Sequence, residues 1–395
     1  MKTKKKILLF HDIFLMKGGA ERMNIEIAKI LDADIATAYW SPDCYDARFM
    51  GFKGNIIQVH PHFKKGMLGF IKMKWRFFRS KKILKEYEIV FFSNEAISAI
   101  WGLSEHQKSF YYAHSISRHL FDLYDEYLAK VPRMAKIPYK ITAFFLKKIY
   151  LSEIKKVDTL FVNSKTNKKR AGKWLGRKDA HILYPPVDTK KFSPEHNTHF
   201  REKFPGLPNT FFLSFARLTH TKRIDHIIEA FRSMPDKNVV ILFGPEDSQR
   251  EEYMRLAEIE PTKEKGKAIQ SKKYPNIYFY CLKNNDDLVD CIRNATATIA
   301  VSKNEDFGMV VTESAACGTP VIAINEGGFQ ETIKVGENGL FLDTHDDTHI
   351  YAAIIKMITE TPETYWEKLA KTCTNSIEEF SLENFEKKLK EFVEK

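Results

Sequence analysis

The sequence predicts an α/β protein that contains two doubly wound parallel sheets. Short runs rich in Val, Ile and Phe alternate with helix-length amphipathic runs along the whole chain, with about six strand candidates in each half. Such alternation is typical of parallel sheets covered by helices. A length of 395 residues also exceeds what one ordinary core fills, so we expect two domains.

The expected strands are short apolar runs that end at polar or turn residues. In the first half they cover residues 6–11, 34–39, 56–60, 89–93, 109–113 and 159–163, and in the second half residues 211–216, 239–243, 277–282, 297–301, 321–324 and 340–342. Helices are expected at residues 20–31, 140–155, 166–175, 222–233, 286–294 and 350–360.

Paired prolines mark the domain boundary. The run Tyr184-Pro185-Pro186-Val187-Asp188 stops regular structure and suits a linker, and the chain from there to about residue 208 reads as a polar loop. We therefore expect domains at residues 1–188 and 189–375. The end of the chain reads as an amphipathic helix within residues 376–395, with Ser381 as its cap.

Composition excludes a disordered chain, because 44% of the residues are hydrophobic and 13% are aromatic. Charge is uneven: residues 1–190 carry 36 Lys and Arg against 18 Asp and Glu, whereas residues 191–395 carry 26 against 33. The cationic first half favours an anionic partner, whether membrane, phosphate or nucleic acid. Five cysteines without a CxxC spacing indicate a reduced, intracellular protein.

The basic start of the chain precedes an apolar run that is too short for a signal peptide, and no window is long enough for a membrane span. We expect a protein that is soluble or peripheral to a membrane. The most basic segment, residues 63–85, carries cations and no acid, with Phe70, Trp75, Phe77 and Phe78 interleaved. It fits an anionic membrane surface, nucleic acid, or a helix whose rings pack into the core and whose charges are solvated.

Two carboxylates form the most specific pattern in the second half. Glu305 follows the strand at residues 297–301, and Glu313 lies near the start of the next helix. Ligands of open α/β sheets bind at the carboxyl ends of strands. Acceptor-only groups there suit a ligand rich in hydroxyls, such as a sugar with a ribose. The alternative is a surface acid followed by a Glu that the helix dipole favours.

Arg217 and Lys222 form a candidate diphosphate clamp, because one follows a strand and the other begins a helix. Two solvated cations are the alternative. Gly327-Gly328 follows the strand at residues 321–324 and resembles a point of close backbone approach at the same edge.

In the first half, Gly18-Gly19 follows the first strand and opens the first helix, where backbone N–H groups can meet a phosphate. It lacks the third glycine of a dinucleotide fingerprint, and a tight turn is equally compatible. His114 ends a strand and is either a ligand-facing or a structural histidine. Asp32-Ala33-Asp34 spells a DxD pattern but falls between a helix and a strand, so we interpret it as a turn and expect no metal site.

Together these residues resemble the GT4 family of retaining glycosyltransferases, which have the GT-B architecture of two Rossmann-like domains facing each other across a cleft. The resemblance covers nearly the whole chain and is most specific in residues 304–322. The segments at residues 11–22 and 114–124, with the form Glu-Asp-Phe-Gly at residues 305–308, look most like bacterial O-antigen mannosyltransferases.

The resemblance implies roles for the matching positions. Arg217 and Lys222 would bind the donor diphosphate, Glu313 would accept from the ribose, and Glu305 would accept from the hexose. The backbone N–H groups of Phe307, Gly308 and Met309 would help to hold the sugar. His114 would lie beside the donor sugar, and Gly18 and Gly19 would shape the loop where acceptor and donor phosphate meet. The helix in residues 376–395 would cross back onto the first domain.

The resemblance further implies a metal-independent hexosyltransferase without a cofactor, which takes a nucleotide sugar, GDP-mannose in preference to UDP-sugars. The family pattern often has Gly where this chain has Ala216, and Gly near the base where it has Cys281 or Leu282, so these positions do not select between guanine and uracil. The acceptor would be a glycan or a polyprenyl-diphosphate-linked glycan, reached by a cytoplasmic protein at the inner face of the membrane.

The expected partners are this donor, the acceptor and an anionic membrane surface, and not nucleic acid. Three rival functions remain open at this point: a UDP-sugar-dependent retaining transferase, a GT-B epimerase or hydrolase of nucleotide sugars, and a basic protein that binds membranes or nucleic acid without catalysis.

Overall fold

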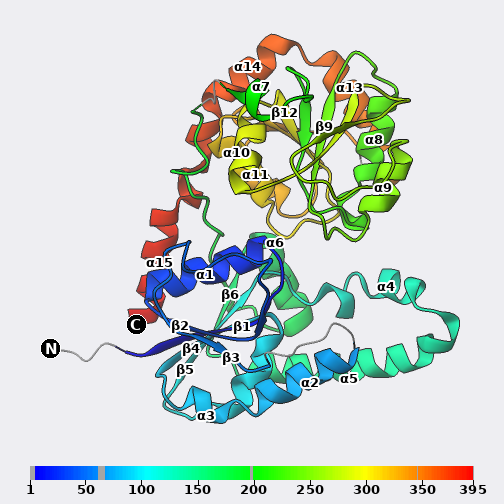
Figure 1. Cartoon of the computed structure of the whole chain (residues 1–395). Helices are drawn as coiled ribbons and strands as arrows, with labels where there is room; N and C mark the ends of the chain where they lie inside the picture. The colour runs from blue at the N-terminus through cyan, green and yellow to red at the C-terminus, as the bar shows by residue number, and fades with distance from the viewer. Residues whose placement is uncertain (1–4, 61–66, 196–198, 345, 395) are drawn as a thin grey trace. The chain divides into compact units, whose positions relative to one another are not determined.

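The computed structural model describes residues 5–60, 67–195, 199–344 and 346–394, and the chain divides into two compact units (Figure 1). Unit 1 comprises residues 1–185 and 386–395, and unit 2 comprises residues 186–385. The sequence places the boundary at residue 188, and the observed division falls between Pro185 and Pro186.

Unit 1 contains a seven-stranded parallel sheet in the order β3-β2-β1-β4-β5-β6-β7. The order reverses at β1, so the carboxyl ends of β1 and β4 flank a topological switch point, where ligands of such sheets bind. The strands are β1 (Ile7–Phe14), β2 (Asp34–Trp40), β3 (Ile56–Gln58), β4 (Ile89–Ser93), β5 (Lys108–Ala113), β6 (Thr159–Val162) and β7 (His181–Ile182).

Helices cover both faces of this sheet, with α1 on one side and α2, α3 and α5 on the other (Figure 1). The helices of unit 1 are α1 (Gly19–Leu31), α2 (Met67–Phe78), α3 (Lys81–Leu84), η1 (Asn94–Gly102), η2 (Arg118–Leu120), α4 (Tyr124–Lys130), η3 (Arg133–Ala135), α5 (Lys136–Lys155), α6 (Lys165–Arg170) and the π-helical η4 (Ala171–Leu175).

The last helix, α15 (Leu382–Glu394), completes unit 1 through its final turns. Phe91, Phe110 and Phe161 stack across β4, β5 and β6, and the ring of Phe392 from α15 meets Phe161 edge-on with the centroids 5.0 Å apart. Leu389 is fully buried. Apolar burial of this kind holds the end of the chain on unit 1.

Unit 2 contains a second seven-stranded sheet in the order β10-β11-β9-β8-β12-β13-β14, in which only the short edge strand β10 is antiparallel to its neighbour among the described residues. Here the order reverses at β8, so β8 and β12 lie side by side and deliver their following loops to one edge. The strands are β8 (Phe212–Ser214), β9 (Val239–Phe243), β10 (Ala268–Gln270), β11 (Ile277–Cys281), β12 (Ala297–Ala300), β13 (Val321–Ala323) and β14 (Gly339–Phe341).

The helices of unit 2 surround a core built on the buried residues of β9, β11 and β12. They are α7 (Phe200–Lys203), η5 (His220–Lys222), α8 (Ile224–Arg232), α9 (Arg250–Leu256), α10 (Asn285–Arg293), α11 (Met309–Ala316), α12 (Phe329–Thr332), η6 (Asp347–His349), α13 (Ile350–Glu360), α14 (Glu363–Thr372) and η7 (Cys373–Phe380). Within the described ranges, no helix combines the length and the apolar character needed to cross a bilayer.

The predicted class of two doubly wound sheets is confirmed, with two corrections. Each sheet has seven strands where about six were expected, because β7 and β10 are too short to show a strand period. The segment after the prolines is not a polar loop: Phe192, Phe200 and Phe204 are buried, and Arg293 Nε donates to the carbonyl of Ser193.

The segment that follows the paired prolines packs against unit 2 at Val187. Val187 is fully buried, and its N–H donates to the carbonyl of Phe380 over 2.8 Å.

The DxD pattern is a turn, as expected. Asp32 adopts a left-handed conformation after α1, and the carboxylate of Asp34 accepts from the side chains of Asn55 and Tyr87.

Candidate active site

The site residues predicted from the sequence fall into two groups, one in each unit. In unit 2, Lys222 and Glu305 lie 83 positions apart in the chain and form an ion pair, with Lys222 Nζ 2.6 Å from Glu305 Oε2. Lys222 follows β8 and Glu305 follows the neighbouring strand β12, so the sheet order brings them together. Both side chains are about one fifth exposed, so a ligand in solvent can reach the pair.

The loop that carries Glu305 rests directly on the Gly327–Gly328 turn. The Gly328 N–H donates to the Glu305 carbonyl over 2.7 Å. A Cβ at Gly327 would lie 2.3 Å from the Glu305 carbonyl oxygen, and one at Gly328 would lie 2.3 Å from the Cα of Phe307. Only glycine permits this approach of two backbones, so the expectation of a close contact at Gly327–Gly328 is confirmed.

Arg223, which the sequence analysis did not select, links three of the loops around this pair. It is buried and has a left-handed backbone with φ of 52°. Its guanidinium donates to the Val301 carbonyl over 3.2 Å, and it pairs with Glu326 at 3.4 Å and Asp347 at 2.5 Å. Glu326 in turn accepts from the Asn304 N–H over 2.9 Å. A buried cation with this many acceptors is well compensated and fixes its partners.

The loop that carries Arg217 is hydrogen-bonded to Asp247, which lies in the loop after β9. Arg217 itself is exposed. Burial raises the pKa of the nearby Asp247 carboxyl, and hydrogen bonds from the N–H groups of Gly244 and Leu218, together with the charges of Arg217 and Arg250, oppose that rise. Asp247 therefore ties the loop after β9 to the residue next to Arg217.

The helix α11 begins at this edge. Gly308 precedes its first residue with φ of 95°, and a Cβ there would lie 2.7 Å from the ring of Phe329. Met309 opens the helix, while Phe307 is buried against Phe380 with the ring centroids 5.4 Å apart. Glu313 is the fifth residue of α11, and at 7% exposure it is much less open to solvent than Glu305.

In unit 1, His114 lies directly after β5 and joins a buried polar cluster with His11, Asn24 and Ser93. Asn24 Nδ2 lies 3.1 Å from His114 Nε2, 3.0 Å from His11 Nδ1 and 3.1 Å from Ser93 Oγ. The His114 carbonyl accepts from Asn163 Nδ2 over 2.7 Å. Burial, together with the neighbouring His11, lowers the pKa of His114 to about 3, so its ring is neutral near pH 7.

Asp12, near the carboxyl end of β1, belongs to the same region. Its Oδ1 accepts from the Ile13 N–H over 2.8 Å and from Asn94 Nδ2 over 3.3 Å, and it lies 3.4 Å from His11 Nε2. Burial raises the pKa of Asp12 to about 7, with the Glu95 charge adding to the rise and the hydrogen bonds opposing it. Asp12 can therefore lose or gain a proton near neutral pH.

Gly18 and Gly19 open α1 as expected, with Gly18 as the N-cap residue. A Cβ at Gly18 would lie 2.3 Å from Glu21 Oε2, so glycine here makes room for the Glu21 carboxylate at the helix start. Further along the chain, Arg118 and Asp122 form a local ion pair at 2.9 Å.

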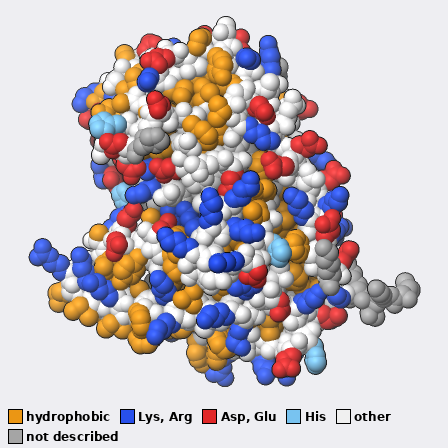
Figure 2. Space-filling model, turned by 180° about the vertical axis from the view of Figure 1, so that it is seen from behind, with side chains coloured by type: hydrophobic (Ala, Val, Ile, Leu, Met, Phe, Trp, Pro, Cys, Tyr) orange, Lys and Arg blue, Asp and Glu red, His pale blue; other side chains and the backbone are white. Residues whose placement is uncertain are grey.

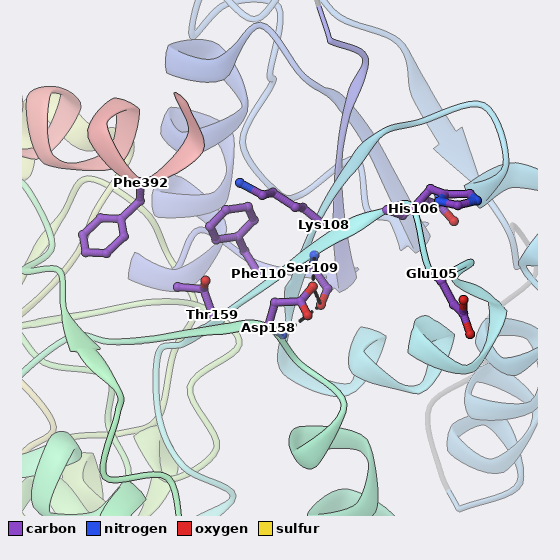
Figure 3. Close-up of a pocket in the computed structure, with 9 residues that line it drawn as sticks. Glu105, His106, Lys108, Ser109, Phe110, Asp158, Thr159 and Phe392 are labelled. Carbon is purple, nitrogen blue, oxygen red and sulfur yellow. Dashed lines mark hydrogen bonds between the residues drawn. The ribbon is translucent and has the colours of Figure 1, made fainter. Parts of the chain in front are cut away.

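A hollow of about 450 Å³ in unit 1 lies away from these residues (Figure 3). Its wall includes Lys108 and Thr159, the first residues of β5 and β6, so it opens at the amino ends of the strands. Asp158 in this wall already accepts from the N–H and hydroxyl of Ser109 over 2.8 and 2.7 Å. The hollow is therefore not the predicted site.

The structure thus brings Lys222 and Glu305 into contact, and gathers Arg217, Gly308 and Met309 on loops and a helix start at the same sheet edge. His114 lies in unit 1 with a separate set of partners. Sequence reasoning missed Arg223, Asn24 and Asp247. Only Asn24 carried a signal, as a polar residue on the buried face of an amphipathic helix.

Comparison with known proteins agrees with this arrangement. Residues 196–378 match the family model Glycosyl transferases group 1. A D-inositol 3-phosphate glycosyltransferase of Acidothermus cellulolyticus is 31% identical over 187 residues, which cover 45% of this chain and 40% of that relative. The chain therefore spans less than half the length of this curated relative.

Two solved structures align over almost the whole chain. Sucrose-phosphate synthase from Thermosynechococcus elongatus has a TM-score of 0.76 at 17% identity, covering 99% of this chain and 98% of that one. Anabaena HepE in complex with UDP and glucose has a TM-score of 0.73 at 16% identity, covering 99% of both chains. The chain thus has the GT-B fold, and its residues 196–378 match the Glycosyl transferases group 1 model.

The contact between Gly328 and the Glu305 loop predicts that a methyl group added at position 328 destabilises this loop. Gly328→Ala forces the backbone at Phe307 to move, which lowers the free energy of unfolding by about 1–3 kcal/mol. It also speeds hydrogen exchange in residues 303–308. Gly244→Ala is the control, because its Cβ would meet Asp247 at an ordinary 3.6 Å. Equal exchange rates in both variants would contradict this account of the loop.

The raised pKa of Asp12 predicts that the stability difference between the natural protein and Asp12→Asn depends on pH. Its folded pKa of about 7 exceeds the unfolded value of about 3.9. The stability it contributes is therefore fully present below pH 4 and is lost as the pH rises through 7. Asp12→Asn cannot ionise, so from pH 5 to pH 8 the variant should gain on the order of 2 kcal/mol relative to the natural protein.

Urea unfolding followed by tryptophan fluorescence measures this difference, because four of the five tryptophans, Trp40, Trp75, Trp101 and Trp174, belong to unit 1. Parallel stability curves for the two proteins over this pH range would show that Asp12 titrates normally.

Proposed function

We propose that the protein is a retaining glycosyltransferase that moves a hexose from a nucleoside diphosphate sugar to a hydroxyl group. The observation that carries the proposal is the 2.6 Å pair of Lys222 and Glu305, which lies at a sheet switch point within the residues that match the Glycosyl transferases group 1 model. A cation and a carboxylate at one edge match the two halves of such a donor, its diphosphate and its hydroxyls.

In the proposed donor complex, Lys222 moves from Glu305 to the diphosphate. Glu305 is then free to accept hydrogen bonds from the hexose hydroxyls, and the N–H groups of residues 307–309 face the sugar at the start of α11. Arg217, which is exposed, adds a guanidinium fork to the same phosphates. Glu313 takes the ribose hydroxyls, and its small exposed area limits it to a ligand that lies against α11.

The proposed chemistry breaks the bond between the anomeric carbon and the donor phosphate oxygen while the acceptor oxygen forms its bond on the same face. The leaving diphosphate takes both bonding electrons and accepts the proton of the acceptor hydroxyl. Negative charge grows on the diphosphate as the bond breaks. Arg217 and Lys222 therefore stabilise the transition state more than the ground state.

For the donor we propose GDP-mannose, on the resemblance of the Glu305–Gly308 form to bacterial O-antigen mannosyltransferases. UDP-sugars are the alternative, and HepE, which shares the fold, was solved with UDP and with UDP-glucose. Where the family often has a glycine, this chain has the buried Cys281, the last residue of β11, or Leu282, so this position does not select between the two bases.

For the acceptor we propose a glycan or a polyprenyl-diphosphate-linked glycan at the inner face of a membrane. The excess of Lys and Arg in residues 1–190 supports an anionic acceptor. The name of the Acidothermus relative likewise refers to a phosphorylated compound, D-inositol 3-phosphate. Asp12 and His114, at the carboxyl ends of their strands, are the groups of unit 1 that we assign to this region.

Calorimetric titration tests the donor clamp. The protein should bind GDP-mannose, and Arg217→Ala should weaken binding about 10- to 100-fold through loss of a charge-assisted hydrogen bond. Arg255→Ala is the matched control, because Arg255 of unit 2 is exposed and pairs only loosely with Glu251 at 3.3 Å. Saturable binding of UDP-glucose in place of GDP-mannose would reassign the base, and unchanged binding in Arg217→Ala would remove the clamp.

A further inference from the structure

Helix α5 exposes a row of large apolar side chains on its outer face. Ile137, Ile141, Phe144, Phe145 and Ile149 are 71%, 54%, 55%, 57% and 43% exposed. Their spacing of four, three, one and four residues places them on one side of a helix. The opposite side is already used, since Ala143, Tyr150 and Ile154 are buried in the core of unit 1. The row is therefore not the side of α5 that the fold packs inward.

Helix α2 repeats the arrangement. Ile71, Trp75 and Phe78 are 52%, 55% and 55% exposed at helical spacing, while Met73 and Phe77 point into the core. This corrects the sequence-based interpretation of residues 63–85, in which Phe77 was a candidate surface ring. Phe63, Lys64 and Lys65 of that segment lie outside the described residues.

The two helices are neighbours on one side of the sheet (Figure 1). Lys74 of α2 joins them, because its Nζ lies 2.6 Å from Glu95 Oε2 in η1 and 3.8 Å from Glu153 Oε2 in α5. We call the exposed rows of α2 and α5 the apolar–basic face. Orange and blue side chains lie together along the lower rim of unit 1 (Figure 2).

The charges within the two segments that carry these rows are almost all positive. Residues 69–85 carry seven Lys and Arg and no acid, and residues 133–156 carry seven and one acid, Glu153, which is buried. Several cations lie over exposed rings: Arg79 is 4.6 Å from the Trp75 centroid and Lys148 is 4.5 Å from the Phe144 centroid. Apolar side chains flanked by cations on flexible stems match the boundary between acyl chains and phosphate headgroups.

We propose that the apolar–basic face docks unit 1 on an anionic lipid bilayer, with the α5 row in the acyl boundary and the flanking Lys and Arg on lipid phosphates. The inference adds the contact surface to the proposed function and rests on that function only for the identity of the acceptor. Charge argues against the other occupants. A second copy of the face would bring two cationic surfaces together, and nucleic acid would leave both apolar rows in water.

Flotation with vesicles tests the proposal on the full chain. The protein should float with vesicles of phosphatidylcholine and phosphatidylglycerol, and much less with phosphatidylcholine alone. The double variant Phe144→Ser/Phe145→Ser should reduce partitioning about tenfold or more, through the apolar area it removes. Phe49→Ser is the matched control, because Phe49 is 92% exposed in unit 1 but lies between β2 and β3, outside both helices.

A charge variant separates the two contributions. Arg79→Glu/Lys82→Glu should reduce the preference for phosphatidylglycerol and the salt sensitivity of binding. Both variants alter exposed side chains, so circular dichroism and the affinity for the donor should match the natural protein. That match distinguishes failure of the docking face from failure of the proposed function.

Several outcomes would overturn the proposal. The first is that the natural protein does not float with the anionic vesicles. The second is that the Phe144→Ser/Phe145→Ser variant floats as well as the natural protein. A vesicle-free dimer that the same variant dissociates would assign the face to a second copy of the chain. Tighter binding to a DNA or RNA oligonucleotide than to vesicles would assign it to nucleic acid.

Discussion

The ion pair of Lys222 and Glu305 is the interaction on which the candidate donor site depends. In the absence of a ligand, each charge needs a partner, and the pair supplies both at 2.6 Å. A nucleotide sugar offers a replacement for each, phosphate oxygens for the lysine and hydroxyl donors for the glutamate. We therefore propose that the two charges neutralise each other in the pair and become two separate ligand-binding groups when a donor enters.

Two sets of contacts in unit 2 position the loops that carry this pair. The Gly327–Gly328 turn supports the Glu305 loop backbone to backbone, and buried Arg223 connects the end of β12 to Glu326 and Asp347. Arg223 accepts an unfavourable left-handed backbone to do so. Its burial and its several acceptors indicate a positioning residue, whereas Arg217, Lys222 and Glu305, which we propose to contact the donor, are open to solvent.

The candidate residues of unit 1 differ from those of unit 2, because burial favours their uncharged forms. Burial lowers the pKa of His11 and His114 to about 3 and raises that of Asp12 to about 7, so the region is close to neutral in charge. Its polar groups are organised by hydrogen bonds from Asn24 and Asn163. Such a region suits hydrogen bonding to a hydroxyl acceptor, while the cations of unit 1 lie on its outer helices α2 and α5.

Much of the fold could be predicted from the sequence, because apolar runs of strand length end at polar or turn residues. The bounds of β4, β9 and α13 agree with prediction to the residue, whereas β7 and β10 are too short to carry a period. Lys222 and Glu305 were both selected, since Lys222 begins a predicted helix and Glu305 follows a predicted strand. Their contact needed the strand order, which places β8 beside β12.

Other features carry no local signature. An arginine with a left-handed backbone looks like any cation in a basic loop, so Arg223 was missed. The outward row of α5 was also missed, because the helix is apolar on its buried side as well. Only the packing of Tyr150 and Ile154 shows which row is left in solvent.

The most direct test of this account is a crystal structure of the protein with GDP-mannose or UDP-glucose bound, in which the distance from Lys222 Nζ to Glu305 Oε2 is measured. We predict that the 2.6 Å pair opens, with Nζ on a diphosphate oxygen and the Glu305 carboxylate on a hexose hydroxyl. A bound nucleotide sugar that leaves the pair closed and contacts neither side chain would contradict the account.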